Sequence, residues 1–150
     1  SQTLAFYRNK IKEEPLSPHH YADLGHHLIL EHEFTEAAAV FKEGLLLVLD
    51  GKASEGGHRL WSEVDRVIVK QYDYGDAAAL KAGREAMLAL LRDLHRERKE
   101  IRNLQFYINY INCADALNFL QEAQERFADA WELYPDHKQL QPYLKRGYAP

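Results

Sequence analysis

Large apolar residues and small residues recur at helical spacing between residues 21 and 44, and this pattern limits the possible folds more than any other feature. The recurring residues are Tyr21, Leu24, Gly25, Leu28, Phe34, Ala37, Phe41 and Gly44. Offsets of 0, +3, +4 and +7 share one face of an α-helix, because each residue turns the chain by about 100°. The pattern therefore predicts two helices that pack closely at Gly25 and Ala37, with Phe34 and Phe41 filling the space between them.

The same spacing recurs twice, and a shorter helical pattern precedes it. From Trp61 the offsets reach Val64, Asp65, Ile68, Tyr74 and Ala77. From Tyr107 they reach Tyr110, Ile111, Ala114, Leu120, Ala123, Phe127, Ala130 and Pro135. Before the first unit, Tyr7 and Ile11 lie on a short amphipathic segment that ends at Pro15.

The aromatic residue, the Leu-Gly pair and the later Ala-x-x-x-Phe segment resemble the tetratricopeptide repeat (TPR). The resemblance implies an all-α fold of stacked antiparallel helical hairpins, a TPR-like α-solenoid. We predict one domain over residues 1–150. Its parts are a half-repeat at 3–15, repeats at 18–50, 58–100 and 104–135, and a C-terminal cap at 137–150. A whole protein and a domain cut from a larger one both remain open.

The repeats are longer than the usual length of about 34 residues. Tyr21 and Trp61 are 40 residues apart, and Trp61 and Tyr107 are 46 apart. The Gly and Ser residues in 50–57 predict a loop there. Residues 77–100 contain no Pro, which predicts a middle helix lengthened by about three turns.

Composition narrows the function classes. The chain of 150 residues has a net charge of −4, which disfavours a nucleic-acid partner. Its single Cys113 cannot form an internal disulfide, and no apolar run is long enough to span a membrane. We expect a cytoplasmic protein without a membrane or nucleic-acid partner.

The sequence lacks the common catalytic and metal-binding motifs. It has no Gly-rich phosphate loop, no Cys-x-x-Cys, no His-Glu-x-x-His and no Gly-x-Ser-x-Gly. No two of the clustered histidines, which are His19, His20, His26, His27 and His32, are four residues apart. We therefore expect no enzyme activity, no cofactor and no metal site, although the histidines could make the surface pH-sensitive. In residues 92–100, interleaved charges predict an exposed helix face rather than a nucleic-acid patch.

In tetratricopeptide proteins the first helix of each hairpin lines a concave groove that holds an extended peptide, so the resemblance implies such a groove here. The helix face opposite the apolar stripe supplies the candidate peptide-binding residues: His19, His26, Arg59, Ser62, Arg66, Gln105, Ile108, Asn109 and Asn112. The amides of Asn109 and Asn112 suit the backbone of a peptide, or they only solvate the helix. Arg59 and Arg66 suit a carboxylate, or they pair with Glu63 between them.

These features lead us to predict a non-enzymatic scaffold that binds a protein or peptide segment. The Lys and Arg residues of the family's chaperone-tail clamp are absent, so we expect a different partner. The alternative is a regulatory or dimerisation domain of a multidomain protein, and other domains of the same chain are then candidate partners. Leu45 to Gly51 and Trp61 loosely resemble the bacterial transcriptional activator domain, and an accessory domain of a transferase is also open.

Overall fold

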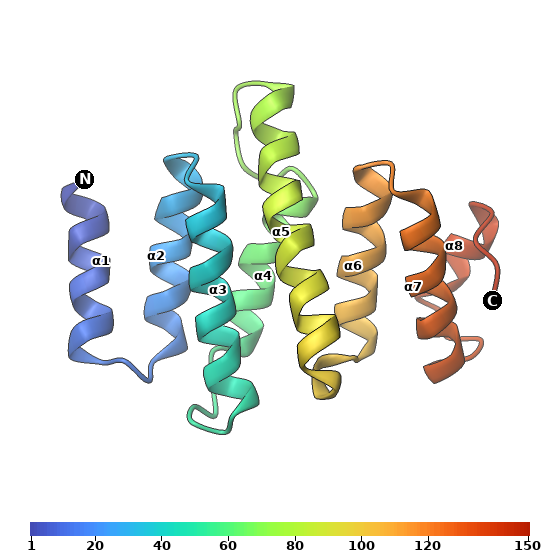
Figure 1. Cartoon of the computed structure of the whole chain (residues 1–150), viewed down its shortest axis with the longest axis horizontal. Helices are drawn as coiled ribbons and strands as arrows, with labels where there is room; N and C mark the ends of the chain where they lie inside the picture. Colours follow the sequence, from blue (N-terminus) through green and yellow to red (C-terminus); the bar gives the residue numbers. More distant parts are fainter. The chain divides into compact units, whose positions relative to one another are not determined.

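The computed structural model describes residues 1–150 and contains only helices (Figure 1). In chain order they are α1 (Gln2–Glu13), α2 (Pro18–Leu30), α3 (Phe34–Leu49), α4 (Gly57–Ile68), α5 (Ala77–Glu97), the 3-10 helix η1 (Lys99–Ile101), α6 (Leu104–Ala116), α7 (Leu120–Leu133) and α8 (Gln141–Lys145). The all-α expectation is confirmed. None of the helices is both long enough and apolar enough to cross a membrane.

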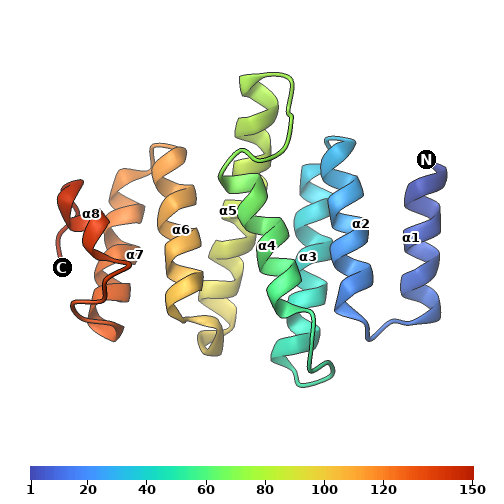
Figure 2. The same cartoon turned by 180° about the vertical axis from the view of Figure 1, so that it is seen from behind.

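The chain forms two compact units, Ser1–Leu90 and Leu91–Pro150. In the first unit, α2 packs against α1, α3 and α4. In the second unit, α6 and α7 form a hairpin, and α8 lies beside α7 in both views (Figures 1 and 2). The prediction of a single domain with three repeats stays a prediction.

The first hairpin is built as its residue spacing predicts. Tyr21, Leu24 and Leu28 are buried on α2, and Ala37 and Phe41 are buried on α3. Helix α2 ends in a tight reversal, in which the N–H of Glu33 donates to the carbonyl of Leu28 at 2.9 Å and the N–H of His32 to that of Ile29 at 3.0 Å. These two bonds satisfy carbonyls that the helix end would otherwise leave unpaired, and they turn the chain back into α3.

Helices α4 and α6 end with the same reversal as α2. The residue after the cap has a positive φ in all three, at His32, Lys70 and Asn118, with values of 59°, 63° and 65°. The following N–H donates to the carbonyl five residues earlier each time: Glu33 to Leu28, Gln71 to Arg66 and Phe119 to Ala114. The first helix of each predicted repeat therefore terminates in one local geometry.

Two expectations about the lengthened middle are confirmed. The chain between α3 and α4, residues 50–56, is irregular, as the Gly and Ser content predicts. Residues Ala77–Glu97 form one continuous helix of 21 residues, α5. The absence of Pro in this stretch allows its backbone hydrogen bonds to continue without a break.

The apolar stripe of α4 begins one residue earlier than predicted. Its buried positions are Leu60, Glu63, Val64, Val67 and Ile68, which are offsets 0, +3, +4, +7 and +8 from Leu60. Tyr21 and its stripe on α2 have the same offsets. Trp61 and Asp65, the predicted stripe residues, are only half-buried, so this part of the prediction was wrong by one residue. The shift places a carboxylate, Glu63, where α2 has Leu24.

The second hairpin follows its predicted stripe except at one end. Tyr107, Tyr110, Ile111, Ala114, Ala123, Phe127 and Ala130 are all buried. Leu120 is 54% exposed because it is the first residue of α7 and lies at the surface of the second unit. The core of this unit is aromatic, with the ring centroids of Phe106 and Tyr107 5.6 Å apart.

Replacing Gly25 with Ala should destabilise the first unit by about 1–3 kcal/mol, because overpacking a close contact costs that much. A Cβ at this position would lie 2.1 Å from Cε1 of Phe41, whose ring is fully buried. Urea unfolding of the purified chain measures the change. The matched control is Gly57→Ala, where the nearest atom to the added Cβ is 3.5 Å away. Equal free energies of unfolding for the two variants would contradict the close packing of α2 on α3.

Candidate functional site

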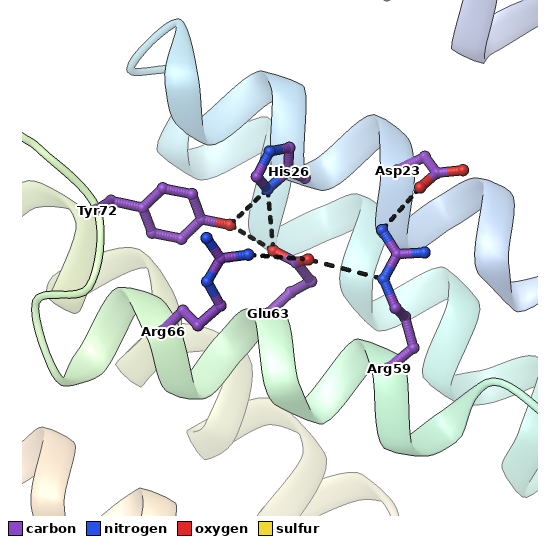
Figure 3. Close-up of polar contacts among 6 residues, drawn as sticks. All are labelled: Asp23, His26, Arg59, Glu63, Arg66 and Tyr72. Atoms are coloured by element: carbon purple, nitrogen blue, oxygen red, sulfur yellow. Dashed lines mark hydrogen bonds and ion pairs between the residues drawn. The ribbon is translucent and has the colours of Figure 1, made fainter.

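Six polar residues from two helices and the following segment meet on the first unit (Figure 3). We call them the α2–α4 cluster: Asp23 and His26 from α2, Arg59, Glu63 and Arg66 from α4, and Tyr72 from the segment after α4. Asp23 and His26 are three residues apart, as are Glu63 and Arg66, and this spacing puts each pair on one helix face. The packing of α2 on α4 then brings the two faces together.

The Glu63 carboxylate is the centre of the cluster. Its side chain is only 5% exposed. Oε1 lies 3.7 Å from Nε of Arg59 and 3.5 Å from Nη1 of Arg66. Oε2 accepts the hydroxyl proton of Tyr72 and lies 3.3 Å from Nδ1 of His26. A buried carboxylate needs such partners because removal from water disfavours an unpaired charge.

Tyr72 defines the hydrogen bonding of His26. Burial raises the pKa of the Tyr72 hydroxyl well above its usual range, as do the hydrogen bond to Glu63 and the charge of that carboxylate. Tyr72 therefore keeps its proton at neutral pH and donates it to Glu63. A hydroxyl has only one proton, so Nδ1 of a neutral His26 must donate to the Tyr72 oxygen, 2.8 Å away. This tautomer leaves Nε2 of His26 as a hydrogen-bond acceptor.

The two arginines are held in place and remain partly open to solvent. The side chains of Arg59 and Arg66 are 38% and 36% exposed. Nη2 of Arg59 donates to Oδ1 of Asp23 at 2.7 Å. The guanidinium of Arg66 lies over the ring of Tyr72, 4.5 Å from its centroid. Each guanidinium has five N–H donors, and these contacts use only some of them. The cluster therefore offers fixed donors to an acceptor on another molecule.

The structure brings together three of the candidate residues of the first unit. His26, Arg59 and Arg66 all contact Glu63. His19 and Ser62 are exposed and lie outside the α2–α4 cluster. The interpretation that Glu63 pairs with both arginines is confirmed.

The candidate residues of the second unit have different environments. Gln105 is exposed and donates to Oδ1 of Asn109 at 3.2 Å, and Ile108 is half-buried. Asn109 is 1% exposed, and its Nδ2 has no hydrogen-bond partner. Asn112 accepts from the hydroxyl of Tyr143 at 2.5 Å. The expectation that Asn109 and Asn112 form an accessible pair needs correction, because Asn109 is packed inside the unit and the Asn112 oxygen already has a donor.

Sequence reasoning missed Tyr72 and the burial of Glu63. Tyr72 lies after the end of α4, where no helical spacing applies. Counting the stripe of α4 from Trp61 puts Glu63 at offset +2, on the opposite face of the helix. The signal that could have corrected this was Leu60, since the offsets from Leu60 reach the apolar residues Val64, Val67 and Ile68.

The clustered histidines of residues 19–32 take part in several different contacts of the first unit. No group of three His, Cys, Asp or Glu side chains is arranged to hold a metal ion. His27 stacks on Tyr7 with ring centroids 4.7 Å apart, and His32 stacks on Phe34 at 5.3 Å. Nε2 of His20 lies 3.5 Å from Oε1 of Glu14. These histidines therefore contact separate partners. Cys113 is buried, which removes it from contact with a substrate.

His95 lies among aromatic rings in the second unit. Its ring stacks on Phe106 with an interplanar angle of 3°, and Tyr110 meets it edge-on at 88°. Burial, followed by the positive charges of Arg126 and Arg102, lowers the pKa of His95 from 6.5 to about 4. The carboxylate of Asp129, 3.8 Å from Nε2, only partly offsets these effects. His95 is therefore neutral at physiological pH.

Glu63→Gln should lower the free energy of unfolding by about 1–3 kcal/mol. The substitution removes the charge that faces Arg59 and Arg66, and breaking a buried ion pair is strongly destabilising. Urea unfolding at pH 7 measures the change. Lys81→Gln is the control, because Lys81 pairs with Glu85 at an exposed site where such a pair contributes about 0–1 kcal/mol. Similar losses in both variants would show that Glu63 is not a buried centre.

The stability of the second unit should rise with pH between about 4 and 6.5. In this window His95 is protonated in the unfolded chain and neutral in the folded chain, so lowering the pH favours unfolding. The destabilisation that comes from protonating His95 on unfolding is complete below about pH 4 and absent above about 6.5. Unfolding midpoints from pH 4 to 7 for the native chain and His95→Phe give the test. The variant should have a shallower slope, and identical slopes would contradict the lowered pKa.

Comparisons of the chain with protein-family models, with curated proteins and with solved structures found no match.

Proposed function

We propose that this chain is a non-enzymatic scaffold of TPR-like hairpins that binds an extended protein or peptide segment. The observation that carries the proposal is the α2–α4 cluster, in which a buried carboxylate holds two partly exposed guanidiniums. Such donors need no rearrangement before they meet an acceptor, and this preorganisation favours binding.

The repeated helix ends support the assignment to TPR-like hairpins. The first helix of each predicted repeat ends in the same reversal, with a positive φ at His32, Lys70 and Asn118. The stripes of α2 and α4 also share the same offsets once α4 is counted from Leu60. Stacked hairpins repeat one structural unit, and the shared C-terminal reversal of α2, α4 and α6 fits such a repeat.

The chemistry of the cluster favours a partner that presents oxygen atoms. Arg59 and Arg66 supply N–H donors, and Nε2 of His26 supplies one acceptor. The backbone of an extended segment supplies both C=O acceptors for the arginines and N–H donors for His26. A carboxylate also pairs well with a guanidinium. The charges of Asp23 and Glu63 balance those of the two arginines, so the surface selects by hydrogen-bond geometry as well as by charge.

The contacts within the α2–α4 cluster favour binding over acid–base catalysis. Glu63 is enclosed by four partners, and Tyr72 is kept protonated by the raised pKa of its hydroxyl. A general base must instead reach the proton that it removes from a substrate. The proposal is therefore a binding role.

Arg66→Gln should weaken binding of the best ligand by at least about tenfold. A charge-assisted hydrogen bond contributes about 1.5–3 kcal/mol, and 1.4 kcal/mol corresponds to tenfold in affinity. An array of extended peptides with different charges identifies the ligand, and calorimetric titration measures its Kd. Raising the salt concentration should also weaken binding, because exposed charges are screened.

Lys81→Gln is the control for this titration, since Lys81 is exposed on α5 and outside the cluster. A loss of binding in Lys81→Gln with no change in Arg66→Gln would overturn the assignment to the α2–α4 cluster. Turnover of any substrate by the purified chain would overturn the non-enzymatic role.

A further inference from the structure

The segment that follows α8, residues 146–149, is bound to the α6–α7 hairpin in part by hydrogen bonds to its backbone. The amide of Gln124, on α7, pairs with both polar groups of Ala149. Its Oε1 accepts from the N–H of Ala149 at 2.9 Å, and its Nε2 donates to the carbonyl of Ala149 at 2.6 Å. A side-chain amide that meets a peptide unit in this way binds an extended chain whatever its side chain is.

Asp115, on α6, accepts hydrogen bonds from two side chains of the same segment. Its Oδ2 accepts from Nη2 of Arg146 at 2.8 Å and from the hydroxyl of Tyr148. Burial and the hydrogen bond to Asp115 raise the pKa of Tyr148 to about 12, so this hydroxyl remains a donor at neutral pH. One carboxylate therefore recognises an arginine and a tyrosine that are two residues apart.

Apolar contacts complete the site. The ring of Tyr148 lies 5.8 Å from that of Phe127, which is fully buried. A hollow of about 280 Å³ lies beside the segment, lined by Asp115, Leu120, Gln124, Arg146, Gly147 and Tyr148. Leu120 is 54% exposed, so an apolar surface is open next to the polar contacts.

The backbone N–H groups of Arg146, Gly147 and Tyr148 donate to carbonyls of α8, and the contacts that join this segment to α6 and α7 are each weak. Helix α8 ends at Lys145, and residues 146–149 belong to no helix. The bonds between Gln124 and Ala149 are exposed, and the side chain of Arg146 is 50% exposed. Exposed ion pairs contribute about 0–1 kcal/mol and single hydrogen bonds about 0.5–1.5 kcal/mol. Local opening of such a segment does not require the unit to unfold.

We propose that Asp115, Gln124 and Phe127 form a binding site for an Arg-Gly-Tyr segment of a partner protein, and that residues 146–149 occupy this site as a displaceable ligand in cis. The partner segment turns at its Gly, as the chain does at Gly147 with a φ of 104°, and presents a guanidinium and a phenol two residues apart. This site lies in the second unit and does not depend on binding at the α2–α4 cluster.

The test uses a fluorescent peptide with the sequence of residues 143–150, titrated into the full chain. The native chain should bind it weakly, because a tethered segment competes at an effective concentration in the millimolar range. The double variant Arg146→Ser/Tyr148→Ser weakens the cis ligand and should bind the peptide at least about tenfold more tightly. Adding Gln124→Ala should reverse most of that gain, since it removes both bonds to the backbone.

A control peptide with Ser at the Arg146 and Tyr148 positions should bind neither protein. Equal affinity of the native chain and the double variant for the probe, or no binding to either, would overturn the proposal. Helical circular dichroism of the double variant should match that of the native chain.

Hydrogen exchange of the native chain gives a second measurement that holds even where the variant fails to fold. The amide of Ala149 should exchange far faster than that of Phe127 in α7. Equal protection of the two amides would mean that the segment is an integral part of the fold, and the proposal would fail. None of these measurements involves Arg66, so they succeed or fail independently of the peptide-array experiment.

Discussion

The packing of α2 against α1, α3 and α4 is the constraint on which the first unit depends. Two small residues make it possible. Gly25 leaves room for the ring of Phe41, and a Cβ at Gly44 would lie 2.9 Å from Tyr21 and from Leu60. Because α2 and α4 approach closely, whatever the stripe of α4 carries must be buried between them. That stripe contains Glu63, so the close packing itself creates the need for Tyr72, His26 and the two arginines around one carboxylate.

Three carboxylates in the chain have the same two kinds of partner. Glu63, Asp115 and Glu122 each accept from a tyrosine hydroxyl and contact an arginine. At Glu122 the partners are Tyr110 and Arg92, and the hydrogen bonds from Arg92 and Tyr110 help to keep the pKa of this carboxyl below its usual range. A carboxylate has lone pairs for both kinds of donor, so this arrangement satisfies it whether it is buried, as Glu63 is, or half-buried.

The three sites differ in what supplies the donors. At Glu122 they come from helices, and at Glu63 they come from helices and the segment that follows α4. At Asp115 they come from Arg146 and Tyr148, which lie in the turn that ends α8 and are tied by their backbone N–H groups to carbonyls of that short helix. An interaction of one chemistry can therefore stabilise a core at one site and bind an exchangeable segment at another. Burial and the rigidity of the donor decide between these outcomes.

Local patterns in the sequence predict the all-α class, the first hairpin, the loop between α3 and α4 and the long α5, because helical spacing, turn residues and the absence of Pro act locally. The α6–α7 stripe could be read in the same way, and so could the pairing of Glu63 with Arg59 and Arg66 at three and four residues. Other features depend on packing in three dimensions: α4 turns its Leu60 face inward, Asn109 is buried, and Tyr72 and residues 146–149 reach their carboxylates. These contacts join residues far apart in the chain, and they depend on how close two helices pack, which no local pattern measures.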